Sequence, residues 1–121
     1  PRNLIGGHFV SAIIGVTVQK FVPDILWLTA PLAVSFSIVF MPITKTLHPP
    51  GGATALIAVT GSLQLKNLGY WYVVCPVLVG ALILLIVALF FNNITSNRQY
   101  PTTKKFEKIR KKIPFFPKYI K

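Results

Sequence analysis

Four apolar runs constrain this chain more than any other feature, because they carry too little charge for a water-soluble domain. The strongest covers residues 70–91 and includes the segment VLVGALILLIVALFF. Two others cover residues 4–22 and 25–43, and a shorter one covers residues 51–65. A helix that crosses a bilayer needs ~20 mostly apolar residues. The sequence therefore predicts an all-α polytopic membrane bundle of four helices, with a short third helix.

The pattern within these runs favours helices over strands. No run shows the period-two alternation of a strand, and strands in lipid require a closed barrel, which four segments cannot form. We therefore expect residues 1–97 to form a helical transmembrane domain. The single Cys75 excludes an internal disulfide, and its place in an apolar run predicts a small packed side chain.

The charges are concentrated near one end of the chain. The 13 Lys and Arg residues against 2 Asp and Glu give a net charge of +11, and most of the basic residues lie in residues 98–121. If all four helices cross, the positive-inside rule places both termini and the 44–50 loop in the cytoplasm. We expect a multi-pass protein of a prokaryotic cytoplasmic membrane.

Residues 98–121 are predicted to form a basic cytoplasmic tail that contacts anionic lipid headgroups. Each Lys or Arg near such a surface contributes about 1 kcal/mol. Phe106, Ile109 and Ile113 recur at helical spacing, which indicates an interfacial amphipathic helix, with a flexible solvated tail as the alternative. Nucleic acid is a poor partner, because the rest of the chain is too apolar to face water.

Aromatic residues gather near the ends of two runs on the same side of this arrangement. Trp27 lies near one end of the second run, and Tyr70, Trp71 and Tyr72 open the fourth. Amphipathic rings of this kind prefer the headgroup region of a bilayer. All four side chains are therefore predicted to lie at that interface.

Residues 44–54, with the sequence TKTLHPPGGAT, form the most informative stretch between two runs. The prolines lack amide donors and favour extended backbone, and the glycines permit unusual dihedrals and close approach. A helix that begins after them would present free amides and a positive dipole end, both of which attract anions. A plain turn between two helices is the alternative interpretation.

Cations and histidines surround this segment in the predicted arrangement. His8 lies near the start of the first run on the same side as His48, and an ionisable side chain in a membrane segment is a functional candidate by default. A histidine can also relay protons near neutral pH, with pairing to a neighbouring helix as the alternative. The predicted anion-binding residues are Arg2, His8, Lys45, His48, Pro49, Pro50, Gly51, Gly52 and Thr54.

Small residues recur at every fourth position in three of the runs. In the first run they are Gly7, Ser11 and Gly15. In the second run they are Ala33 and Ser37. In the third run they are Thr54, Ala58 and Ser62. Stripes of this kind let membrane helices pack closely, so we predict helix contacts at all three.

Catalytic and metal-binding signatures are missing from the sequence. Asp24 and Glu107 both lie at or beyond the ends of apolar runs, and no serine-hydrolase, zinc-protease or phosphate-loop motif occurs. Two histidines without a third ligand make a poor metal site. We therefore predict neither enzyme activity nor a metal or other cofactor.

Three stretches of the chain resemble the HPP family of integral membrane proteins, which is named after its His-Pro-Pro motif. They are PRN at residues 1–3 with IGGH at 5–8, LHPPGGATAL at 47–56, and NN at 92–93 followed by Arg98, Tyr100 and Pro101. The resemblance implies a domain of four membrane helices. It also implies transport, because plastid and cyanobacterial relatives are associated with nitrite movement.

Both arguments lead to a transporter or channel for a small inorganic anion, with nitrite as the first candidate. The anion would be held at the amino end of the helix after HPPGG, with a proton link through His8 or His48. The alternative is a non-transporting structural or partner-binding membrane module with a lipid-binding tail. Four helices, one of them short, are few for a complete transport pathway, so assembly into a homo-oligomer is a further alternative.

Overall fold

The computed structural model describes residues 1–94, which contain helices and no strand. This confirms the predicted all-α class for the described part of the chain. The predicted basic tail, residues 98–121, lies outside the described residues. Residues 1–82 form one compact unit, and the chain from Ile83 onward belongs to a second, so each unit is described by itself.

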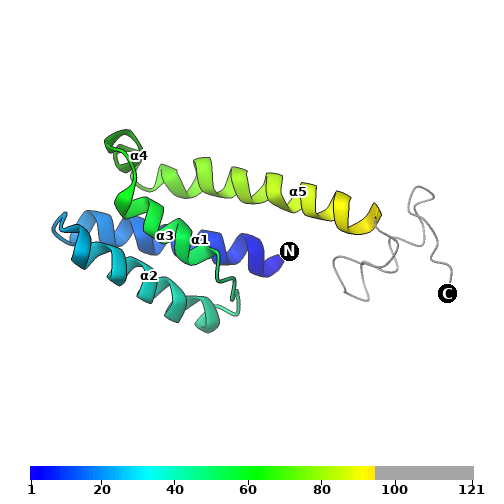
Figure 1. Cartoon of the computed structure of the whole chain (residues 1–121), viewed down its shortest axis with the longest axis horizontal. Helices are drawn as coiled ribbons and strands as arrows, with labels where there is room; N and C mark the ends of the chain where they lie inside the picture. The colour runs from blue at the N-terminus through cyan, green and yellow to red at the C-terminus, as the bar shows by residue number, and fades with distance from the viewer. Residues whose placement is uncertain (95–121) are drawn as a thin grey trace. The chain divides into compact units, whose positions relative to one another are not determined.

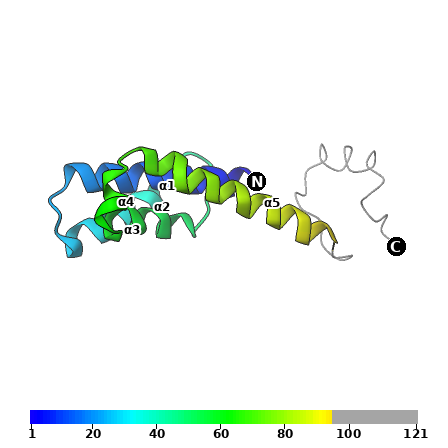
Figure 2. The same cartoon turned by 90° about the horizontal axis from the view of Figure 1, so that it is seen from above.

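Two long helices, α1 (Arg2–Phe21) and α2 (Leu26–Ile43), form the base of the first unit (Figure 1). A short connection reverses the chain between them, and the two helices lie side by side in both views (Figures 1 and 2). At 1.5 Å per residue each is roughly 27–30 Å long, close to the thickness of a bilayer core. Both are long and apolar enough to cross a membrane.

The third helix, α3 (Gly51–Thr60), packs against both α1 and α2 (Figure 2). Its 10 residues extend only about 15 Å, roughly half the bilayer core. The helix ends earlier than the expected residue 65, because Gly61 adopts an extended backbone with φ −65° and ψ 170°. A short helix, α4 (Leu63–Asn67), follows, and the Ser62 side chain accepts a hydrogen bond from the Leu65 N–H in its first turn.

The fourth apolar run forms a kinked helix. The segment η1 (Val73–Leu78), which contains the kink, is followed by α5 (Val79–Ile94), and together they make the third described segment long enough to cross a membrane. The kink falls at Cys75, whose φ of −130° and ψ of 118° are extended, because a residue before proline avoids the helical region. The prediction that Cys75 is packed is wrong: its side chain is exposed, as lipid-facing positions of an apolar helix are.

Small residues bring the backbones of α1 and α3 close together. A Cβ atom added to Gly15 would lie 2.8 Å from both Cα and the carbonyl oxygen of Ala55. The predicted stripe on α1 is therefore confirmed as a packing face. The residues of α3 that meet it are Gly51, Ala55 and Ala58. Of the predicted stripe on the third helix, Ala58 lies at this contact, whereas Ser62 lies beyond the end of α3.

Ser11 is fully buried in this contact, and its hydroxyl makes no ordinary hydrogen bond. A Cβ on Gly51 would lie 2.8 Å from the Ser11 Oγ, so the Gly51 backbone is close enough to this oxygen for a Cα–H···O contact. Such Cα–H···O contacts recur where membrane helices approach closely and contribute about 0.5–1 kcal/mol each. The hydroxyl thus joins the first turn of α3 to α1.

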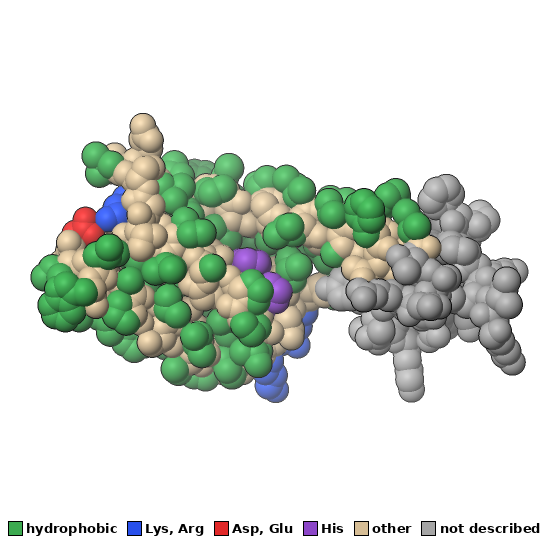
Figure 3. Space-filling model, viewed as in Figure 1, with side chains coloured by type: hydrophobic (Ala, Val, Ile, Leu, Met, Phe, Trp, Pro, Cys, Tyr) green, Lys and Arg blue, Asp and Glu red, His purple; other side chains and the backbone are tan. Residues whose placement is uncertain are grey.

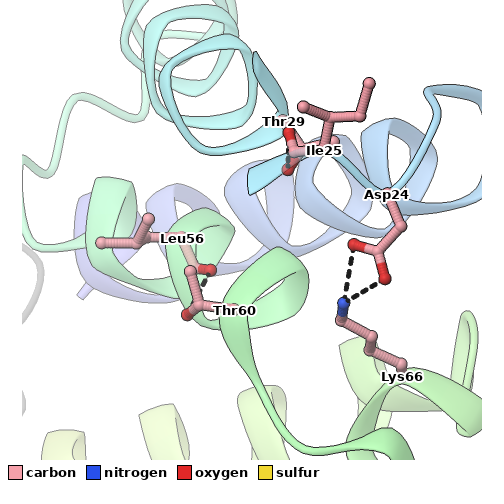
Figure 4. A network of polar contacts seen from close by, with 6 residues as sticks. All are labelled: Asp24, Ile25, Thr29, Leu56, Thr60 and Lys66. Carbon is pink, nitrogen blue, oxygen red and sulfur yellow. Dashed lines mark hydrogen bonds and ion pairs between the residues drawn. The ribbon is translucent and has the colours of Figure 1, made fainter. Parts of the chain in front are cut away.

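An ion pair closes the end of the unit at which α1 and α2 are connected. The Nζ atom of Lys66 lies 2.9 and 3.0 Å from the two carboxylate oxygens of Asp24, joining α4 to the α1–α2 connection (Figure 4). Asp24 is 73% exposed, and exposed pairs contribute only about 0–1 kcal/mol. The nearby hydroxyls of Thr29 and Thr60 donate to the carbonyls of Ile25 and Leu56, each four residues earlier, so both hydroxyls are hydrogen-bonded (Figure 4).

Candidate functional site

The segment between α2 and α3 lies directly against the first turns of α1. The Nη2 atom of Arg2 donates a long hydrogen bond of 3.5 Å to the carbonyl of Thr44. A Cβ on Gly7 would lie only 2.5 Å from the Cβ of His48, and one on Gly6 would collide with Thr46. Glycine at both positions therefore lets α1 approach the loop closely enough to bring His48 beside the helix.

Lys45 occupies a strained position at the end of α2. Its φ is +55°, and the Lys45 and Thr46 N–H groups donate to the carbonyls of Pro42 and Met41 at 2.9 and 2.8 Å. This is the Schellman pattern of a helix end, in which the left-handed residue is usually glycine. A side chain there costs roughly 1–2 kcal/mol. Lys45 therefore combines a strained backbone with an exposed ammonium group. Strained residues cluster at functional sites, which makes Lys45 a functional candidate.

His8 and His48 come together although the chain separates them by two helices. Their ring centroids are 5.0 Å apart with an interplanar angle of 64°, and both rings are visible on one face of the protein (Figure 3). The Nδ1 atom of His8 also lies 2.7 Å from the hydroxyl oxygen of Thr54. The contact therefore links α1, the loop before α3, and α3 itself. Because both rings are half-buried, each keeps a path to the surface.

Tyr72 extends this cluster, and the sequence did not place it there. Its hydroxyl donates to the carbonyl of Thr54 at 2.9 Å, and the residue is only 3% exposed. The prediction that Tyr72 faces the membrane interface is therefore wrong, whereas Trp27 and Trp71 are 77% and 71% exposed. Three consecutive residues of a helix cannot share one face, and a buried tyrosine needs a partner for its hydroxyl. The consecutive positions of Tyr70, Trp71 and Tyr72 were therefore the signal in the sequence that one of these rings turns inward.

The amides at the start of α3 are already hydrogen-bonded. The N–H groups of Gly51, Gly52 and Ala53 donate to the carbonyls three residues earlier at 2.8, 2.9 and 3.2 Å. The free amides expected from the sequence are thus occupied in this arrangement, while the positive end of the helix dipole remains. Gly51 and Gly52 are buried, and Pro49 and Pro50 are exposed. Because these amides are already hydrogen-bonded, an anion bound here would be held mainly by side chains.

The cationic residues of the predicted site share one end of the unit. Arg2 and Lys45 are exposed beside the loop that carries His48. Within residues 1–94 the acidic residue is Asp24, and it pairs with Lys66 where α1 and α2 are connected. The end with the two histidines therefore has a positive field without a carboxylate among the described residues to neutralise it.

The pH dependence of stability provides a test of this cluster. Burial lowers the pKa of His48 below its usual 6.5. Below pH ~6.5 the unfolded chain then binds more protons than the folded one, so stability falls as the pH falls. We expect the melting temperature in detergent to drop between pH 7.5 and 5.5, and His48→Gln to flatten that slope. An equally steep slope in the variant would contradict this assignment.

Comparison with known proteins agrees with the helical arrangement. The family description "HPP, transmembrane region" matches residues 1–101. Two transmembrane proteins of Dictyostelium discoideum are 46% and 43% identical over 104 residues, 84% of this chain. The chain spans about a third of their length, 36% and 33%. No solved structure matches significantly. The match over most of the chain shows that this protein belongs to the HPP transmembrane family.

Proposed function

We propose that the protein carries a small inorganic anion across the membrane, with nitrite as the first substrate to test. The observation that supports this most is the His8–His48 pair, bonded to Thr54 and set beside Arg2 and Lys45. Ionisable side chains are costly in membrane segments and commonly mark solute or proton pathways. The positive-inside rule favours the cytoplasmic side for this end.

The positive end of the unit would concentrate anions before they bind. Lys45 and Arg2 extend into solvent there and have no carboxylate partner within residues 1–94. Long-range attraction of this kind raises the local anion concentration and weakens as salt screens it, over about 8–10 Å at physiological ionic strength. Uptake should therefore decline with rising ionic strength, and it should decline less once Lys45 has lost its charge.

The histidine pair would make the direct contacts. A neutral imidazole offers one N–H donor and a protonated one offers two, so protonation of His48 or His8 would strengthen the hold on an anion. The positive end of α3 lies next to His48 and would add to this attraction. Because α3 extends through only about half a bilayer core, it resembles the half-helices on which transporters build solute sites.

Uptake into liposomes tests the proposal directly. The purified full chain would be reconstituted and exposed in turn to nitrite, nitrate, formate, bicarbonate and chloride, with protein-free liposomes as the baseline. We expect uptake of at least one of these anions, and greater uptake when a proton gradient favours protonation of the histidines. No uptake of any of the five above the baseline would overturn the proposal.

Two variants separate the mechanism from the fold. His48→Ala should lower uptake at least tenfold, because it removes the ring at the centre of the contact. Lys45→Gly removes the charge and also relieves the positive φ, so the protein should become more stable while uptake falls. Lys45→Arg keeps the charge and should preserve uptake. Full uptake by Lys45→Gly would exclude the ammonium from the mechanism.

A further inference from the structure

An apolar groove of about 410 Å³ lies between α1 and α2, away from the histidine cluster. Its walls include Ile14, Val18 and Phe21 from α1 and Phe36 and Phe40 from α2. This volume is within the range of roughly 300–1,000 Å³ that is typical of ligand pockets. Both helices are candidate membrane spans, so the molecules that surround this groove are lipids rather than water.

One end of the groove coincides with the end of the candidate span α1, where we expect the membrane interface. Phe21 is the last residue of α1, and Lys20 precedes it. Exposed aromatic residues, Trp27 and Trp71, lie at this end of the first unit, as they do at headgroup level in membrane proteins. The groove thus runs from the interface toward the middle of the bilayer, along the path of an acyl chain.

Lys20 supplies a charge next to the Phe21 end of the groove, although its own side chain is not part of the groove wall. The described ion pair joins Lys66 to Asp24, and the exposed Lys20 ammonium instead lies 5.9 Å from the centre of the Tyr70 ring. The Tyr70 hydroxyl lies 3.1 Å from the Oγ1 of Thr17, which itself lines the groove. A cation and two hydroxyl groups are therefore placed beside the end of an apolar channel.

We propose that this groove binds an anionic phospholipid. One acyl chain would lie along Ile14, Val18 and Phe36, and the headgroup phosphate would pair with the Lys20 ammonium. A phosphate is the complementary partner of this ammonium, since its oxygens accept charge-assisted hydrogen bonds. The site is separate from the histidine cluster and does not depend on the transport proposal.

The test uses the full chain, purified in detergent and depleted of lipid. Phosphatidylglycerol and phosphatidylcholine with identical acyl chains would be titrated in parallel, and binding would be counted by native mass spectrometry. We expect phosphatidylglycerol to bind more tightly, with Lys20 contributing about fivefold, the factor that matches ~1 kcal/mol for one lysine near an anionic group. Lys20→Gln should lower this preference about fivefold without unfolding the protein, because the side chain is exposed. The basic residues 98–121 are the same in both proteins, so their contribution cancels in this comparison.

Two controls make the result specific to this site. Lys45→Gln removes the same charge from the other end of the unit and should leave the lipid preference intact. Phe36→Ala removes an exposed wall of the groove and should weaken the binding of both lipids alike. Equal binding of the two lipids to the unmodified protein, or a lost preference in Lys45→Gln, would overturn the proposal. A stable dimer that excludes lipid would do so as well, by assigning the groove to a second copy.

Discussion

Gly15→Val is expected to lower the free energy of unfolding by about 3 kcal/mol, the largest effect on stability that we predict. A Cβ at Gly15 would lie 2.8 Å from the Cα and carbonyl oxygen of Ala55, and 2.8 Å from the Cβ of Ala58. Two of these three atoms belong to the backbone of α3, so no side chain can rotate to relieve the overlap. The helices must move apart, which also disturbs the contact between Ser11 and Gly51. Chemical or thermal unfolding in detergent measures the loss.

Gly80→Val is the matched control for this prediction. Gly80 is also a helical glycine in a candidate membrane span, but a Cβ there meets no atom within 4 Å. The same residue change should therefore leave the stability within about 0.5 kcal/mol, as substitutions away from packed features usually do. Equal losses in the two variants would show that valine in an apolar helix, and not the α1–α3 contact, causes the effect.

Thr54→Val should reduce anion uptake at least tenfold in the liposome assay. The substitution keeps the shape of the side chain but removes the hydroxyl that lies 2.7 Å from the His8 Nδ1. His8 would then lose the partner that holds its ring toward His48, and a half-buried polar atom without a partner costs roughly 1–3 kcal/mol. Thr54→Ser keeps the hydroxyl and should restore most of the uptake.

Thr60→Val is the control for the hydroxyl on the same helix. The Thr60 hydroxyl donates only to the carbonyl of Leu56 in its own helix, and its side chain is exposed. Uptake by this variant should therefore match that of the unmodified protein. If Thr54→Val also transports normally while remaining folded, the His8–Thr54 contact has a structural role, and the proposed pathway must lie elsewhere.

Several features of the site could be predicted from local sequence. The apolar runs indicated membrane helices, and the glycines and prolines of residues 47–52 indicated an irregular segment before a short helix. The stripe of Gly7, Ser11 and Gly15 indicated a close helix contact. These inferences depend on hydrophobicity, helical period and backbone freedom, which are properties of a residue and its near neighbours.

Other features follow from contacts between distant segments. Tyr72 was placed at the membrane interface with its aromatic neighbours, yet its hydroxyl meets the carbonyl of Thr54 in the core. The amides of Gly51 and Gly52 were expected to be free, yet turn hydrogen bonds occupy them. The partner of Tyr72 depended on which helix face turned inward. The glycine amides instead bond to carbonyls three residues earlier, in a local turn whose conformation was not predicted.

The amino-acid sequence alone thus determines that this protein folds in lipid as helices, because the cost of exposing long apolar runs to water depends only on composition and length. It also determines which residues can lie close to a neighbouring backbone. The pairing of His8 with His48 and Thr54, and the burial of Tyr72 beside them, are decided by tertiary structure. Those contacts depend on the rotation and depth at which α1 and α3 pack, and small residues allow a close packing without specifying which one forms.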